Sequence, residues 1–276
     1  MSEILILFFG AVAAGLLGSL TGLGGGVVII PLLTLGFGIP MHYAIGASLV
    51  SVIGTSSGAA AAFVKEGFTN VRIGMFLEIA TTTGAIIGAM ISGILNPNVI
   101  GIIFASILIL TVILNLRKKP DHQEPLIKGS LEDKLQLHGT FPDHGIIKDY
   151  SARNTVSGFL MMVFAGVMSG LLGIGSGALK VLAMDNMMRL PFKVSTTTSN
   201  FMIGVTAVAS SLIYFQRGEI IPVIVAPVLI GVVLGSYIGS KTLIVSQTKK
   251  LKIIFGVVVT ILSMYMMYNG INENFK

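Results

Sequence analysis

Residues 22–26 read Gly-Leu-Gly-Gly-Gly, and residues 173–177 read Gly-Ile-Gly-Ser-Gly, 151 positions further along the chain. The same offset, without a gap, aligns further identical residues: Gly15 with Gly166, Leu20 with Leu171, Pro40 with Pro191, Ser48 with Ser199, Thr55 with Thr206, Gly67 with Gly218, Gly84 with Gly235, Gly88 with Gly239 and Phe104 with Phe255. A register held over about ninety residues indicates a duplicated structural unit.

The composition predicts a membrane protein. The chain has 276 residues, of which 53% are hydrophobic and only 11% are charged, whereas soluble domains carry roughly 25% charged residues. A lipid bilayer is therefore the expected surrounding. The chain has no cysteine, which excludes disulfides and thiolate metal sites. The net charge of +6 is explained by basic loops that set membrane orientation, so no nucleic acid partner is expected.

Ten apolar runs predict an all-α polytopic protein of about ten helices. They lie near residues 4–21, 24–38, 44–64, 72–94, 99–116, 154–172, 176–189, 194–215, 220–242 and 250–269. The second run of each half is shorter than the ~20 residues that cross a bilayer. The first two runs of each half are thus either two thin spans or a hairpin, broken or re-entrant at the glycines. The first run lacks the basic start of a signal peptide and is expected to be mature structure.

The distribution of basic residues predicts the orientation. With the N-terminus outside, 15 of the 18 Lys and Arg residues fall in cytoplasmic loops, as the positive-inside rule requires. The C-terminus is then also outside. An odd number of crossings in each half places the two repeats in opposite orientations, an arrangement from which alternating access can arise.

The three predicted units are a first transmembrane repeat (1–116), a cytoplasmic linker (117–153) and a second transmembrane repeat (154–276). The linker is polar and is expected to contain short helical pieces. It carries His122, His138 and His144, but their spacing matches no usual ligand pattern, so no metal site is expected. The fourth histidine, His42, is expected to be solvated in a short outside loop.

The glycine strings predict an anion-binding site. If the chain turns at each string and a helix restarts there, the backbone N–H groups of Gly24, Gly25 and Gly26 point toward the membrane interior. Gly175, Ser176 and Gly177 supply the second set, with the Ser176 hydroxyl as a further donor. Close helix packing is the alternative explanation, and it is the one preferred for Gly84, Gly88, Gly235 and Gly239.

Lys180 is a candidate substrate contact, because ionisable residues inside a membrane are rare and face pores or partners. It lies four residues after Ser176, near a helix start that already attracts anions. The alternatives are that it reaches the membrane surface or pairs with Asp185.

Polar residues in the third run of each half form a helical stripe, suited either to a polar substrate or to contacts between helices. Ser48 and Ser199, identical across the repeat, and the neighbouring Asn200 are the expected substrate contacts. Asp185 and Glu78 are candidates for binding a coupling proton. The alternative for Glu78 is an interfacial contact with Arg72.

The glycine strings, with Pro31 and Pro40 after the first and Pro191 after the second, resemble the TauE/SafE sulfite exporter family of bacterial membrane proteins. The resemblance covers nearly the whole chain. It implies transport of sulfite, sulfonates or related small organic anions across the inner membrane. The second half departs from the pattern, because Leu182 stands at the position equivalent to Pro31.

The expected function is therefore secondary transport of a small oxyanion, with no cofactor. A passive anion channel would need the same donors. A membrane-embedded enzyme acting on lipid-linked substrates would need a clustered base or metal ligand, and none is visible; an assembly subunit would have no evident use for glycine breaks in the membrane. The sequence leaves the anion, the direction, the coupling ion and the oligomeric state open, a homodimer included.

Overall fold

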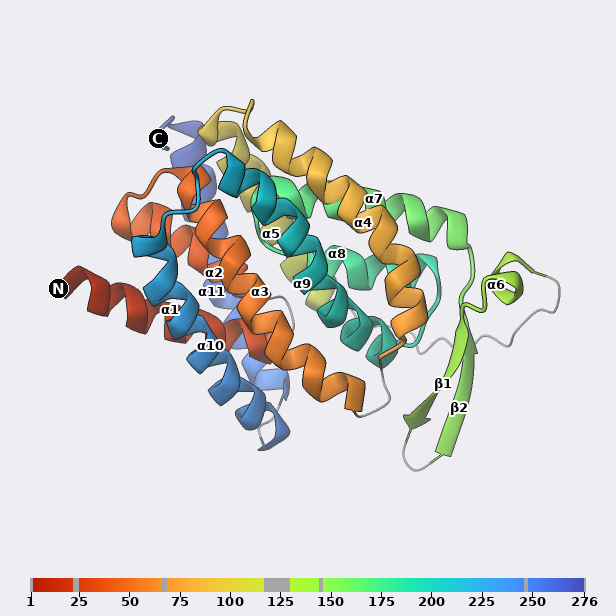
Figure 1. Cartoon of the computed structure of the whole chain (residues 1–276). Helices are drawn as coiled ribbons and strands as arrows, with labels where there is room; N and C mark the ends of the chain where they lie inside the picture. Colours follow the sequence, from red (N-terminus) through yellow and green to blue (C-terminus); the bar gives the residue numbers. More distant parts are fainter. Residues whose placement is uncertain are drawn as a thin grey trace.

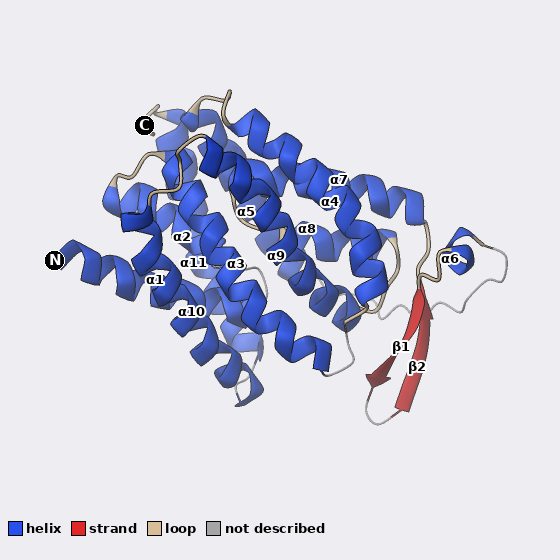
Figure 2. Ribbon diagram, viewed as in Figure 1, coloured by secondary structure: helices blue, strands red, loops and turns tan. Residues whose placement is uncertain are grey.

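The computed structural model describes residues 2–21, 25–65, 69–116, 130–143, 146–245 and 248–275, and nearly all of them are helical (Figures 1 and 2). The elements before the linker are α1 (Ser2–Thr21), α2 (Gly26–Pro31), the π-helix η1 (Leu32–Gly36), α3 (Met41–Lys65), α4 (Val71–Ser92) and α5 (Pro97–Leu116). Those after it are α7 (Thr155–Leu172), α8 (Gly177–Leu182), the π-helix η2 (Ala183–Met187), α9 (Phe192–Gln216), α10 (Pro222–Val245) and α11 (Thr248–Ile271).

Four of the described helices are long and apolar enough to cross a membrane: Val71–Ser92, Thr155–Leu172, Phe192–Gln216 and Pro222–Gly239. Shorter apolar helices accompany them at Leu5–Gly18, Gly26–Gly36, Pro97–Ile113 and Gly256–Ile271. Many of their large apolar side chains are exposed, such as Phe9, Leu160 and Tyr268. A surface of this kind suits lipid rather than water, in agreement with the expected α-helical membrane protein.

The second element of each half is too short to cross. Residues 26–36 rise about 16 Å at the pitch of an α-helix, about half of a hydrocarbon core of ~30 Å. Residues 177–187 have the same length and also pass from an α-helix into a π-helix. Pro31 is the last residue of α2 and lacks the amide that an α-helix would pair with the Val27 carbonyl, and the chain passes there directly into the π-helix η1.

The two ends of the helical bundle are defined by contacts between loops. At one end, which we call the linker end, Thr155 donates from its hydroxyl to Glu132 at 2.9 Å, and the Arg153 amide donates to the Met188 carbonyl at 2.9 Å. At the opposite end Arg217 donates to the Ala89 carbonyl at 2.6 Å, and the Phe275 amide donates to Asn98 at 2.9 Å. Figure 1 shows both termini away from the linker.

The described part of the linker, residues 130–143 and 146–153, contains a short helical piece as expected, α6 (Leu131–Lys134). It also contains an antiparallel pair of strands that was not expected, β1 (His138–Asp143) and β2 (Ile146–Ser151). The apolar side chains of Phe141 and Tyr150 pack edge to face, 5.9 Å apart, which gives the hairpin a small core of its own. His138 lies in β1, whereas His122 and His144 lie outside the described residues.

Asn70 joins this hairpin to two membrane helices. Its side-chain oxygen accepts from the Ile73 amide at 3.0 Å and so caps α4. Its side-chain nitrogen donates to the Tyr150 hydroxyl at 2.8 Å, and its own amide donates to the Thr198 hydroxyl of α9 at 3.1 Å. Burial raises the pKa of Tyr150, against the opposing effect of the Asn70 hydrogen bond.

Glycines bring the closest helix pairs together. A Cβ atom on Gly84 or Gly88 of α4 would collide with the carbonyl oxygens of Val163 and Val167 on α7. The expected packing role of Gly84 and Gly88 is therefore confirmed. Helices α1 and α10 meet in the same way, since a Cβ on Gly235 would collide with the Val12 carbonyl oxygen.

We expect Gly88→Val to separate α4 from α7 and lower the free energy of unfolding by about 1–3 kcal/mol or more. Thermal unfolding of the detergent-purified protein would measure the loss. Gly256→Ala is the control, because its Cβ would meet only Val112 at an ordinary 3.7 Å. Equal unfolding midpoints for the two variants would contradict the close backbone contact.

Candidate functional site

The two glycine strings lie against each other. A Cβ on Gly26, the first residue of α2, would stand 2.9 Å from the Gly173 carbonyl oxygen and 2.6 Å from the Ser48 hydroxyl. The Ser48 hydroxyl donates to that same Gly173 oxygen at 2.7 Å. Only a glycine at position 26 permits this approach. Gly25 is the residue before α2, and Gly24 lies outside the described residues.

The second string turns through left-handed backbone. Gly173, Gly175 and Ser176 have φ angles of 66°, 71° and 44°. Glycine adopts this region readily, but a serine does so at some cost in free energy. The strained Ser176 immediately precedes α8, and its buried hydroxyl has no hydrogen-bond partner among the described residues. Strain and an unpaired hydroxyl at one residue are typical of functional positions.

Ser199 supports the same turn from α9. Its hydroxyl donates to the Gly177 carbonyl at 3.2 Å. Both serines that are identical across the repeat therefore use their hydroxyl hydrogens on backbone carbonyls of the second string. What they can offer a bound molecule is a lone pair rather than a donor. Asn200 follows Ser199 on α9 and is buried.

Lys180 is entirely buried, with 0% of its surface exposed. Its ammonium donates to the hydroxyl of Thr206 on α9 at 2.5 Å, so it does not reach the membrane surface. The Thr206 hydroxyl in turn donates to Glu78 Oε1 on α4 at 2.6 Å. Lys180 and Thr206 are 26 residues apart in the sequence, and Thr206 and Glu78 are 128 apart, yet the three side chains form one chain of contacts.

Glu78 is the buried end of this chain, with 8% of its surface exposed. Its Oε1 also accepts from the Thr82 hydroxyl at 3.1 Å, whereas its Oε2 is buried without a hydrogen-bond partner among the described residues. Arg72, its alternative partner from sequence, is an exposed residue at the start of α4. Asp185 is fully buried in η2.

The structure thus brings together Lys180 and Glu78, two groups that the sequence had assigned to separate roles. It adds Thr206 as the bridge between them. Thr206 was recognisable only as one member of the polar stripe and as the repeat partner of Thr55. Nothing in a single sequence reveals that α4 and α9 pack side by side at this depth.

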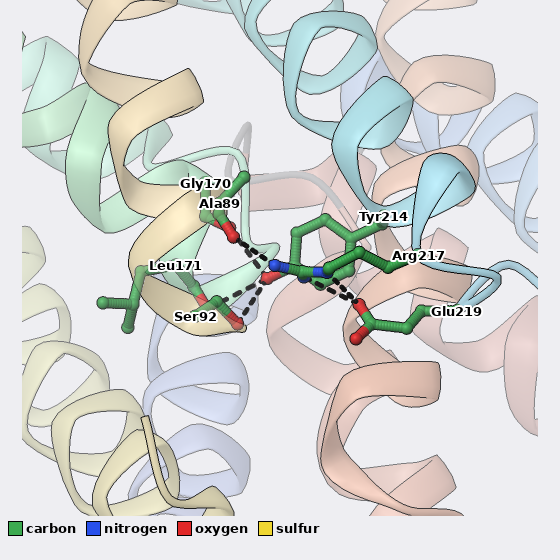
Figure 3. Close-up of polar contacts among 7 residues, drawn as sticks. All are labelled: Ala89, Ser92, Gly170, Leu171, Tyr214, Arg217 and Glu219. Atoms are coloured by element: carbon green, nitrogen blue, oxygen red, sulfur yellow. Dashed lines mark hydrogen bonds and ion pairs between the residues drawn. The ribbon is translucent and has the colours of Figure 1, made fainter. Parts of the chain in front are cut away.

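A second polar cluster closes the opposite end of the bundle (Figure 3). The Tyr214 hydroxyl lies 2.8 Å from Ser92 and 2.9 Å from the Gly170 carbonyl, which joins α9 to α4 and α7. Arg217 lies over the Tyr214 ring and pairs with Glu219 at 2.7 Å.

His42 lies near this cluster in space, close enough for its imidazole to interact electrostatically with Glu219 and Arg217, and it differs from its expected place. It lies in the first turn of α3 and is half-buried, rather than solvated in a loop. Its Nδ1 atom is buried and has no hydrogen-bond partner among the described residues.

Comparison with known proteins identifies the family. The family model for the sulfite exporter TauE/SafE matches residues 7–266, which includes both glycine strings, Glu78, Lys180 and Thr206. The chain belongs to the TauE/SafE family. The family description and the names of two similar proteins together support a membrane transporter.

Two relatives of this TauE/SafE protein are known from Bacillus subtilis (strain 168). The probable membrane transporter protein YunE is 29% identical over 282 residues, covering 98% of this chain and 99% of the relative. The probable membrane transporter protein YdhB is 29% identical over 241 residues, covering 87% of this chain and 89% of the relative. No solved structure matches the chain.

We expect Thr206→Val to lower the free energy of unfolding by about 1–3 kcal/mol, because it removes the hydroxyl that links two buried charged groups without changing the side-chain shape. Thermal unfolding in detergent would report the change. Thr196→Val is the matched control, since Thr196 lies on the same helix and its hydroxyl donates to the Phe192 carbonyl one turn earlier, as the Thr206 hydroxyl also does to the Met202 carbonyl. A loss no larger than that of the control would show that the bridge contributes nothing.

Proposed function

We propose that the protein is a secondary transporter that moves a small oxyanion across the bacterial inner membrane by alternating access. The observation that carries this proposal is the fully buried Lys180, one helical turn after a strained serine with an unpaired hydroxyl. The Lys180 amide donates to the Ser176 carbonyl at 3.0 Å, which places the two residues one helical turn apart at the start of α8. An ammonium and a hydroxyl at these two positions would be the donors of an oxyanion site.

The substrate class follows from size and charge together with the family. One lysine and a few backbone and hydroxyl groups suit a small monovalent or divalent anion. Sulfite, an organosulfonate or a similar organic anion fits the family name, sulfite exporter. Gly25, Gly26, Gly175 and Gly177 would approach the substrate with their backbone.

Alternating access would arise from two halves in inverted orientation. The order and lengths of the helices are alike in both halves. The first helix of each half packs on the fourth apolar segment of the other half: α1 packs on α10, and α7 packs on α4. Likewise α3 packs on α9 and α5 on α11, each on its own counterpart. These contacts recur when the two halves are exchanged, which supports a pseudo-two-fold axis between them. In a transporter with such an axis, the two halves can exchange conformations, and this turns an inward-open state into an outward-open one.

The proposed orientation places the linker in the cytoplasm and both termini outside. In support, Lys65, Arg189 and Lys193 lie at the linker end, whereas Arg217 lies at the opposite end. Basic residues concentrate on the cytoplasmic side of membrane proteins.

We expect sulfite, methanesulfonate, sulfoacetate or acetate to raise the unfolding temperature of the purified protein, with the true substrate class giving the largest shift. Lys180→Met should remove the shift while the variant still inserts and purifies. Lys193→Met, which deletes an exposed lysine at the linker end, should keep it. Unchanged stabilisation of Lys180→Met by every anion would exclude Lys180 from the site.

Transport itself separates a carrier from a passive channel. In liposomes, Gly175→Val should abolish uptake, because position 175 has a φ angle of 71° and a Cβ there would stand 2.9 Å from Ile203. Gly218→Val is the control with the same backbone strain (φ 72°) but no atom within 4 Å. Uptake against a concentration gradient would exclude a channel, and wild-type uptake by Gly175→Val would contradict the site.

A further inference from the structure

Lys180, Thr206 and Glu78 form one directed hydrogen-bond chain inside the membrane protein. An ammonium group has only donors and an ionised carboxylate has only acceptors, whereas a hydroxyl both accepts and donates. The distances of 2.5 Å from Lys180 to Thr206 and 2.6 Å from Thr206 to Glu78 therefore fit a charged lysine and an ionised glutamate. The chain carries no net charge, which is the form of least cost away from water.

An anion at Lys180 would disturb this balance. The ammonium would turn from Thr206 to the anion, and the site would then hold two negative charges against one positive charge. In a medium of low dielectric constant that excess is costly, and a carboxylate relieves it by taking a proton. Glu78 has an atom available for the proton, because its buried Oε2 has no hydrogen-bond partner among the described residues.

The charged and titratable groups around Glu78 leave Lys180 as its main partner. On its own helix, Arg72 lies exposed near the start. Helix α7, which packs against α4, contains no titratable side chain, and α9 contributes Lys193 near its start and Tyr214 near its end. From the segment of Lys180 itself, η2 adds the buried Asp185. Lys180 is joined to Glu78 through the Thr206 hydroxyl.

We propose that Glu78 is the coupling site of this transporter and takes up one proton from water each time an anion occupies Lys180. This coupling rests on the proposed anion transport, and it sets the stoichiometry at one proton per anion. The empty site holds one positive and one negative charge. The loaded site holds ammonium, anion and neutral carboxylic acid, so it has the same net charge. A monovalent anion and a proton then cross together without moving charge across the membrane.

The first test measures protons directly. Methanesulfonate is added to the purified wild-type protein in weak buffer with a pH-sensitive dye; this probe stays ionised, so any proton taken up binds to the protein. We expect about one proton per bound anion, and an affinity that falls by up to about tenfold per pH unit at high pH. Binding without proton uptake overturns the coupling but leaves anion transport standing. Failure of every anion to bind overturns the proposed function instead.

The second test assigns the proton to Glu78. Glu78→Gln keeps the shape and the acceptor Oε1 equivalent but cannot titrate, so it should bind methanesulfonate without proton uptake and independently of pH. Glu273→Gln, which deletes an exposed carboxylate near the C-terminus, should behave like the wild type. Undiminished proton uptake by Glu78→Gln overturns the assignment. If that variant does not fold, Thr82→Val, which removes a donor to Oε1, should shift the pH dependence of binding upward, and an unshifted profile counts against Glu78.

The third test uses voltage. In liposomes, wild-type uptake of methanesulfonate should respond to a pH gradient and not to a potassium diffusion potential. Uptake by Glu78→Gln should lose the response to the pH gradient and gain one to voltage, since the anion then moves alone. Voltage-driven uptake by the wild type would contradict the one-to-one stoichiometry.

Discussion

A peptide group that leaves a helix inside a bilayer must find its hydrogen-bond partners within the protein, because the lipid offers none. The helices α1 and α7 end at the two glycine strings, and α2 and α8 begin there. Neighbouring helices supply the hydrogen-bond partners that these breaks require. Ser48 of α3 and Ser199 of α9 donate to carbonyls of the second string, and the two strings lie in backbone contact. The third helix of each half is held against the turns for this reason, and its polar face follows from it.

The turns also determine where a charge is buried. Helix α8 begins at the second turn, and its Lys180 is fully buried. Thr206 and Glu78 supply the compensation that a buried ammonium requires. The proposed site therefore combines turns held by the two serines with the Lys180 chain, whose bonding would change when an anion binds. A transporter needs both, since a substrate must be held accurately and then released.

Much of the fold and part of the candidate site could be predicted from the sequence, and the features that were missed have physical causes. Composition fixes the membrane class, and the glycine strings mark the helix breaks because few other residues permit them. The family resemblance is confirmed. The β-hairpin was missed because His138–Asp143 and Ile146–Ser151 are short, polar and within a charged linker. The meeting of Glu78 with Lys180 was missed because it depends on how α4 and α9 pack, and periodicity says nothing about which helices become neighbours. The roles of the proposed site residues remain predictions.

The exchange of first helices between the halves has a consequence for how the protein is made. Helix α1 buries its glycine face against α10, which leaves the ribosome only after roughly 200 more residues have been added. At about 5–20 residues per second, α1 waits about 10–40 s in the membrane without its partner. Helix α7 needs no such delay, because α4 is already in place when it emerges. The nascent first half is thus the vulnerable intermediate of biogenesis, and its close-packing surface is the one that chaperones or quality-control proteases would meet.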